Sequence, residues 1–206
     1  MEIYSSEEQQ VDAIKQFWKD YGNSIIVGAV VGLGGLYGWN YYSAHKIGQA
    51  QNASDAYLAA VNDTSDEAKL AGDIAKFKKE YNQQGYQAML QLMMAKSAVE
   101  ANQLDKAVAV LKDVIADKPG YGIEEIATIR LARIQAEQDQ VSAALTTLSQ
   151  VTSASFLAQR DELKGDLLVR QGDVEQAKAA YEAAMGVAEN ATNPVLKMKL
   201  DNLNQA

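Results

Sequence analysis

The segment that most restricts the fold is an uncharged stretch from Tyr21 to His45, in which residues 25–39 are all apolar, aromatic or glycine. A helix rises about 1.5 Å per residue, so residues 22–42 reach the roughly 30 Å thickness of a bilayer's hydrocarbon core. We therefore predict a transmembrane helix at residues 23–43, embedded in a lipid bilayer. The alternatives are a buried core helix and a cleavable signal peptide. They are disfavoured because no charge interrupts the stretch and five acidic residues precede it.

Lysines near this segment indicate its orientation. Lys15, Lys19 and the terminal amine precede it, whereas only Lys46 follows it closely. Because the side richer in Lys and Arg stays in the cytoplasm, residues 1–22 are predicted to be a cytoplasmic tail. Residues 44–206 then lie across the membrane, which is the periplasm if the source is a double-membrane bacterium.

The tail is amphipathic, with apolar and aromatic residues at helical spacing from Val11 to Tyr21. It either lies on the membrane surface as a short helix or continues the spanning helix, with Gly22 and Asn23 as a local break. Within the span, two G-x-x-x-G patterns predict a close contact with another membrane helix, and Gly35 lies about one turn beyond the first of them. The candidate contact residues are Gly28, Gly32, Gly34, Gly35 and Gly38.

Beyond the span, residues 102–111, 139–148 and 172–181 share one template, at offsets of 37 and 33 residues. In each, an alanine is followed four residues later by Leu or Tyr: Ala107 and Leu111, Ala144 and Leu148, Ala177 and Tyr181. A period near 34 residues, with a small residue where two helices cross, is the tetratricopeptide pattern. An unrelated alanine-rich helical bundle is the alternative.

The predicted fold class is therefore all-α, with one N-terminal transmembrane helix followed by a helical repeat domain. We predict repeats at about 84–119, 124–155 and 160–190. A leading helical pair at 47–61 and 68–81 precedes them, and a helix at 194–203 caps the end of the stack.

Composition excludes several classes of function. The net charge of -8 disfavours nucleic-acid binding, and the absence of cysteine together with a single histidine, His45, disfavours thiolate and multi-histidine sites. We expect no cofactor, no metal site and no catalytic residue. The carboxylate pairs Glu124–Glu125 and Asp161–Glu162 are interpreted as first-turn acids favoured by helix dipoles.

In a tetratricopeptide stack, the first helix of each pair lines the concave face. Methionines there adapt to varied apolar surfaces, and arginines hold carboxylates or carbonyls of an extended segment. A half-buried core stripe with solvated charges is the alternative interpretation. The candidate groove residues are Met89, Met93, Lys96, Ile129, Arg130, Arg133 and Arg170, and Leu92, Ile126, Leu163 and Asp166 are placed beside them.

Five groups of short segments, spread along the whole chain, together resemble the sequence of a known family. They are Met1-Glu-Ile-Tyr4, Val11-Asp-Ala-Ile-Lys15 with Phe17-Trp18, Gly38-Trp-Asn-Tyr41, Ile129-Arg-Leu-Ala-Arg133 and Met198-Lys-Leu-Asp-Asn-Leu203. This set closely resembles the YfgM family of bacterial inner-membrane proteins, which are ancillary subunits of the SecYEG translocon.

The resemblance implies a non-enzymatic, single-pass type II inner-membrane protein with a periplasmic repeat domain. It implies as partners the SecYEG translocon, a PpiD-like membrane-anchored periplasmic chaperone and translocated client proteins. A repeat coordinator of envelope assembly or cell division is the alternative binding function, and an anchored hydrolase with a carboxylate pair is the enzymatic one.

Overall fold

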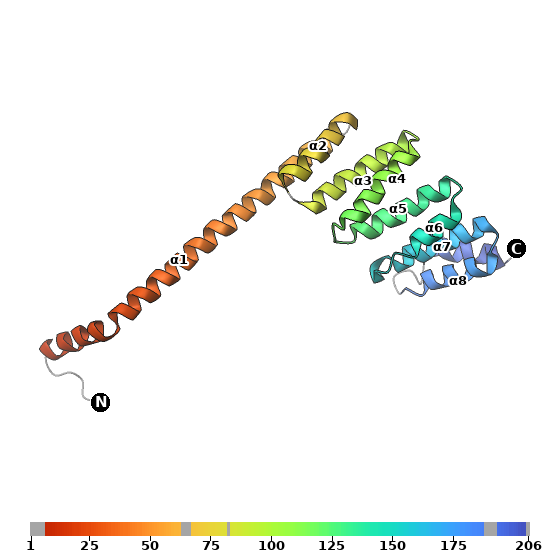
Figure 1. Ribbon diagram of the computed structural model, residues 1–206. Helices are drawn as coiled ribbons and strands as arrows, with labels where there is room; N and C mark the ends of the chain where they lie inside the picture. Colours follow the sequence, from red (N-terminus) through yellow and green to blue (C-terminus); the bar gives the residue numbers. More distant parts are fainter. Residues whose placement is uncertain (1–6, 63–66, 82, 188–192, 205–206) are drawn as a thin grey trace. The chain divides into compact units, whose positions relative to one another are not determined.

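The computed structural model describes residues 7–62, 67–81, 83–187 and 193–204 (Figure 1). These residues form helices joined by short turns and contain no strand, which confirms the all-α class. The chain divides into two compact units, residues 1–51 and residues 52–206.

The first unit consists of most of the long helix α1 (Glu7–Asn62). Its apolar side chains are exposed along the segment predicted to span a membrane: Val30 is 65% exposed, Leu33 68% and Leu36 66%. Only 6% of the most apolar window of this helix is buried, so it is no core helix of this chain. Its length and composition make it a candidate membrane span.

The helix continues through Gly22 and Asn23, and its ribbon has a bend near its N-terminal end (Figure 1). The Trp18 indole packs against Gly22, 3.4 Å from where a Cβ atom would stand. Of the two interpretations of the tail, the structure therefore supports a helix that continues into the span. The helix also continues past residue 43, so the first helix of the leading pair is not separate from the span.

In the second unit, the last residues of α1 pack with α2 (Glu67–Glu80) and the start of α3 (Gln84–Glu100). Ala53, Phe77 and Leu90 are buried in this cluster. The rings of Tyr57 and Tyr86 stack with their centroids 5.1 Å apart.

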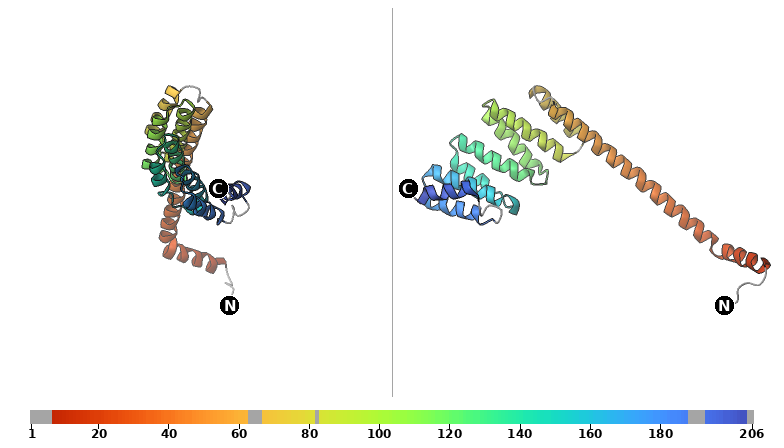
Figure 2. Two further views of the ribbon diagram at one scale, coloured as in Figure 1. Left: turned by 90° about the vertical axis from the view of Figure 1, so that its right-hand side faces the viewer. Right: turned by 180° about the vertical axis from the view of Figure 1, so that it is seen from behind.

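Three helical pairs follow in chain order, as Figures 1 and 2 show. The first joins α3 to α4 (Leu104–Asp117), and the second joins α5 (Ile123–Glu137) to α6 (Val141–Leu148). After a short 3-10 turn at Ala154–Phe156, the third joins α7 (Leu157–Gln171) to α8 (Val174–Met185).

Small residues allow the two helices of each pair to approach closely. Ala107, Ala144 and Ala177 are each 0% exposed, as the repeat template predicts. Each has a buried small residue twelve positions earlier on the partner helix: Ala95, Ala132 and Gly165. Leu111, Leu148 and Tyr181, four residues after the alanines, are at most 3% exposed.

The turn inside each pair has the same backbone form. Asn102, Asp139 and Gly172 follow α3, α5 and α7 and adopt φ values of 57°, 59° and 80°. Asn, Asp and Gly are the residues that enter this left-handed region at least cost. The backbone of the turn therefore explains why the repeat template has Asn, Asp or Gly at this position.

The helix α9 (Pro194–Asn204) closes the last pair. The Asn193 side chain caps it, because its Oδ1 accepts hydrogen bonds from the backbone N–H groups of Val195 at 3.0 Å and Leu196 at 3.3 Å. Leu196 is fully buried with Tyr181 and Ala184 of α8. The apolar surface of α8 is thus covered by a helix of the same chain.

We predict that Gly165→Ala destabilises the domain by about 1 to 3 kcal/mol through overpacking. A methyl group at Gly165 would overlap the ring of Tyr181, whose hydroxyl is held by Asp166. The matched control is Gly72→Ala in α2, where nothing apart from adjacent residues and the helix's own backbone lies within 4 Å of the added Cβ. That change should stabilise by up to about 1 kcal/mol, because alanine favours helix. Urea denaturation of the full chain in detergent, followed by circular dichroism, measures the free energy of unfolding of both variants. Equal effects would contradict the close packing of Gly165 against Tyr181.

Candidate functional site

A cleft of about 370 Å³ lies between α3 and α5, the first helices of the first two repeats. Its lining includes the buried apolar residues Leu92, Ala95, Leu111 and Ile134. Val99 also lines it and is 42% exposed. The cleft therefore offers an apolar surface that is open to solvent.

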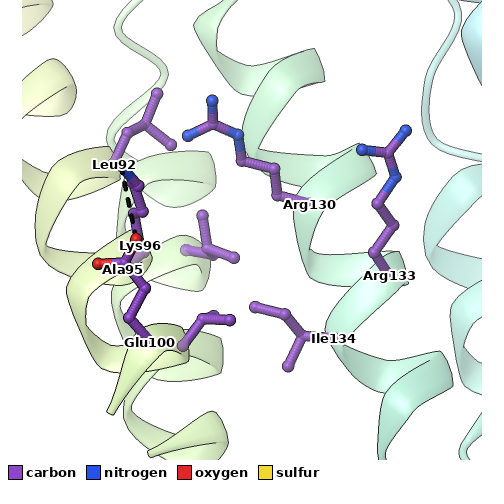
Figure 3. Close-up of a pocket in the computed structure, with 9 residues that line it drawn as sticks. Leu92, Ala95, Lys96, Glu100, Arg130, Arg133 and Ile134 are labelled. Carbon is purple, nitrogen blue, oxygen red and sulfur yellow. Dashed lines mark ion pairs between the residues drawn. The ribbon is translucent and has the colours of Figure 1, made fainter. Parts of the chain in front are cut away.

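Charged side chains surround this apolar surface. Lys96 and Glu100 come from α3 and pair with each other at 3.5 Å, whereas Arg130 and Arg133 come from α5. Figure 3 shows the two α3 side chains on one wall and both arginines extending in the same direction from the other. Within the part of the chain that the structure describes, no ion pair engages either arginine. The cleft thus carries three cations and one carboxylate.

Helical spacing explains why these residues converge. On α3, Leu92, Lys96 and Val99 follow one another at intervals of four and three residues, which places them on one helix face. On α5, Arg130 and Arg133 share a face for the same reason.

The next gap along the stack, between α5 and α7, is bridged by ion pairs at the surface. Arg170 of α7 contacts the Glu137 carboxylate at 3.3 Å and the Asp139 carboxylate at 3.5 Å. Its guanidinium is therefore already occupied by groups of this chain.

The α7–α9 gap is also bridged by ion pairs. Lys199 contacts Glu162 at 2.9 Å and Asp166 at 2.7 Å, and the Tyr181 hydroxyl donates to Asp166 at 2.8 Å. Burial, with the hydrogen bond to Asp166, raises the pKa of Tyr181. Burial alone would lower the pKa of Lys199, but hydrogen bonds to Asp166 and Glu162 raise it above its ordinary value.

The structure brings only some of the predicted groove residues together. Lys96, Arg130 and Arg133 meet in the cleft. The assignment of Ile129 to the groove is wrong: it is 1% exposed and packs in the core with Ala132 and Leu148, because this side of α5 faces the following helices.

The remaining predicted groove residues lie elsewhere. Met89 is 41% exposed on α3 but does not line the cleft. Met93 is half-buried against the cluster formed by the leading pair. Arg170 lies one gap further along the stack. Sequence reasoning did not assign Ala95, Val99, Glu100, Leu111 and Ile134 to the cleft. Val99 and Glu100 are signalled by their positions three and four residues after Lys96.

The glycines of the span face open space. At Gly28, Gly32, Gly34, Gly35 and Gly38, nothing apart from adjacent residues and the helix's own backbone lies within 4 Å of the position that a Cβ would take. A shallow hollow beside Gly28 is lined by Asn23, Ser24, Val27 and Val31. A contact of these glycines with another helix stays a prediction.

The two acidic pairs differ in their surroundings. Glu124 and Glu125 lie in the first turn of α5, as predicted. For Asp161 and Glu162 the prediction is wrong, because α7 begins at Leu157 and places them beyond its first turn. Asp161 instead accepts a hydrogen bond from Arg160 Nε at 2.8 Å.

Paired helices with small residues at their crossings define a tetratricopeptide-like repeat protein, and the family model for a tetratricopeptide repeat-like domain matches residues 15–205. An ancillary SecYEG translocon subunit of Escherichia coli (strain K12) is 34% identical over 207 residues, covering 99% of this chain and all of that protein. The protein of that name from Haemophilus influenzae is 33% identical, covering 96% of this chain and 97% of that protein. The one from Neisseria gonorrhoeae is 26% identical, covering 98% and 100%.

The chain therefore belongs to the family of ancillary SecYEG translocon subunits. This confirms the resemblance to the YfgM family that the sequence motifs indicated.

We predict that Tyr181→Phe lowers the free energy of unfolding by about 1 kcal/mol at neutral pH, because one hydrogen bond is lost. The raised pKa values of Tyr181 and Lys199 mean that the fold favours their protonated forms. Their stabilisation is complete below the unfolded pKa values of about 10 and is lost as pH rises through the folded values. The wild type should therefore lose stability above about pH 10, and the variant should lose less. Urea titrations of the full chain at a series of pH values measure the free energy of unfolding of both proteins. If it fell equally with pH in the wild type and the variant, the proposed role of the Tyr181–Asp166 hydrogen bond would be contradicted.

Proposed function

We propose that this protein is a non-enzymatic scaffold at the SecYEG translocon. Its repeat domain binds a PpiD-like periplasmic chaperone and helps pass newly translocated client proteins to the periplasmic chaperone network. The observation that carries the proposal is end-to-end similarity to proteins named ancillary SecYEG translocon subunits. The proposed binding of the chaperone and handover of clients rest on the resemblance to the family.

The exposed apolar part of α1 supports anchoring in the bacterial inner membrane. The lysine bias supports a cytoplasmic N-terminus and a periplasmic C-terminal domain. In that orientation the cleft between α3 and α5 is on the side where translocated chains emerge.

The repeat domain supports binding rather than chemistry. Stacked helical pairs form extended binding surfaces, and the cleft combines apolar area with charged groups that hold a peptide backbone or carboxylates. Co-purification in mild detergent tests the scaffold proposal. Recovery of SecYEG and a membrane-anchored chaperone with the full chain is expected, and their absence would overturn it.

The membrane topology of the chain is the first test of the proposed periplasmic location of the repeat domain. An alkaline phosphatase fused after Ala206 should be active, and one inserted before Gly22 should be inactive, because this enzyme matures only in the periplasm. A cytoplasmic reporter at the same two positions serves as the control and should give the opposite pattern. Reversed activities would place the repeat domain in the cytoplasm and remove the proposed function.

A second test concerns the glycines of the span. Replacing Gly28 and Gly32 together by leucine should reduce photocrosslinks from the span to SecYEG severalfold, because bulky side chains prevent close helix packing. Membrane insertion should survive, since leucine favours the hydrocarbon. Val30→Leu, which alters a residue that is already large, is the control. Unchanged crosslinks in the glycine variant would mean that the span is only a tether.

A further inference from the structure

We infer that the α3–α5 cleft binds an extended acidic segment of a partner protein, in which an apolar side chain lies next to carboxylates. This inference rests on the proposed scaffold function and names the chemistry of the segment that the scaffold holds. Three observations carry it: the apolar floor of the cleft, the unequal charges around it, and the ion pairs that cross the next two gaps along the stack.

The floor requires an apolar group. Leu92, Leu111 and Ile134 present carbon atoms to the cleft while their side chains remain largely buried, and Val99 is 42% exposed. Burying apolar surface gains about 25 cal/mol per Å², so an aliphatic side chain seated here is favoured over water. The volume of about 370 Å³ lies within the range of about 300 to 1,000 Å³ typical of ligand pockets.

The charges require an acidic partner. Lys96, Arg130 and Arg133 surround the floor with only Glu100 to balance them, in a chain whose net charge is -8. Glu100 pairs with Lys96, which leaves two guanidinium groups for an incoming ligand. Each presents a planar fork of donors that matches a carboxylate.

Equivalent positions in the three repeats show how the charges of this gap differ from those of the next gap along the stack. Glu100, Glu137 and Arg170 correspond at the template offsets of 37 and 33 residues. Arg170 attracts Glu137 across the α5–α7 gap and binds it at 3.3 Å. Across the α3–α5 gap the corresponding residues, Glu137 and Glu100, are both acidic.

A second set of equivalent positions also has like charges across the α3–α5 gap. Lys96, Arg133 and Asp166 correspond at these offsets. Asp166 binds Lys199 of α9 at 2.7 Å, whereas Lys96 and Arg133 on the two sides of the cleft are both basic. Among the described residues, no ion pair therefore crosses the α3–α5 gap that a ligand would have to displace.

The row of side chains fits an extended segment. Residues 92–100 of α3 rise about 12 Å along the helix axis, which matches about three to four residues of extended chain. One apolar side chain on the floor, with acidic neighbours reaching the two arginines, satisfies both parts of the cleft.

The probe is an acetylated and amidated ten-residue peptide with a central leucine between glutamates in a serine–glycine context, carrying a dye on a polar linker. Its binding to the full chain in nanodiscs is measured by fluorescence anisotropy. Replacing the glutamates by glutamine should weaken binding at least about tenfold, since each charge-assisted hydrogen bond contributes more than a neutral one. Replacing the leucine by serine should also weaken it severalfold. Raising NaCl from 0.15 M to 0.5 M should weaken the acidic peptide more than the neutral one.

Protein variants test the same contacts from the other side. Arg130→Gln with Arg133→Gln should reduce affinity for the acidic peptide at least about tenfold and leave the neutral peptide unchanged. Lys112→Gln, which removes an exposed positive charge on α4 outside the cleft, is the matched control and should bind as the wild type does.

Three results would overturn the inference. Equal affinity for glutamate and glutamine peptides would mean apolar contact only, and equal affinity for leucine and serine peptides would mean a general anion site. Unchanged binding by the arginine double variant would place the peptide elsewhere. Because the peptide assay contains no translocon, its failure is distinguishable from a failure to co-purify SecYEG, which would overturn the scaffold function instead.

Discussion

The close approach of paired helices at small residues is the constraint on which the repeat domain depends. Ala107 and Ala144 are fully buried where α4 and α6 pack against their partner helices, and interiors packed at this density leave little room for larger side chains. Each pair is too small to bury its apolar face alone, so it packs on the next pair. Gly165 is the extreme case, since the Tyr181 ring occupies the volume that any side chain there would need. This contact also positions the Tyr181 hydroxyl to donate to Asp166, which in turn pairs with Lys199 of α9. The packing of α9 therefore depends on the absence of a side chain at Gly165.

The same stacking leaves the charges on the first helices free to vary. The backbone fixes which positions face each other across successive gaps, but burial does not constrain side chains that point into a gap. Opposite charges pair across the α5–α7 gap through Arg170, whereas the equivalent residues across the α3–α5 gap carry like charges and form no ion pair among the described residues. A repeat fold can thus place a binding cleft at one interface by changing a few surface residues, without any change in its core.

Sequence reasoning found the features that recur with the repeat period and missed those set by three-dimensional neighbours. The buried alanines and the turn residues were predictable, because their size and backbone form are required in every repeat. Ile129 was misplaced because α5 packs on both the preceding and the following helices, so an apolar residue at helical spacing has two possible buried sides. The role of Asp161 depended on where α7 begins after the 3-10 turn, which no periodic pattern indicates. The ion pairs across two of the gaps were not predicted either, because the repeat template shows that Glu137 and Arg170 are equivalent positions but not that their side chains meet.

The local charge of the cleft and the net charge of the chain act on an acidic ligand over different distances. At physiological ionic strength the screening length is about 8 Å, so charges beyond this distance contribute little to the attraction. Lys96, Arg130 and Arg133 line one cleft, and the excess of carboxylates is spread over the rest of the chain. An acidic segment is therefore repelled weakly by most of the surface and attracted strongly only at close range, where the apolar floor adds its contribution. Selectivity for a short segment follows from this contrast, because a uniformly basic surface would attract any acidic protein, whereas a basic cleft in an acidic domain retains only a segment that fits it.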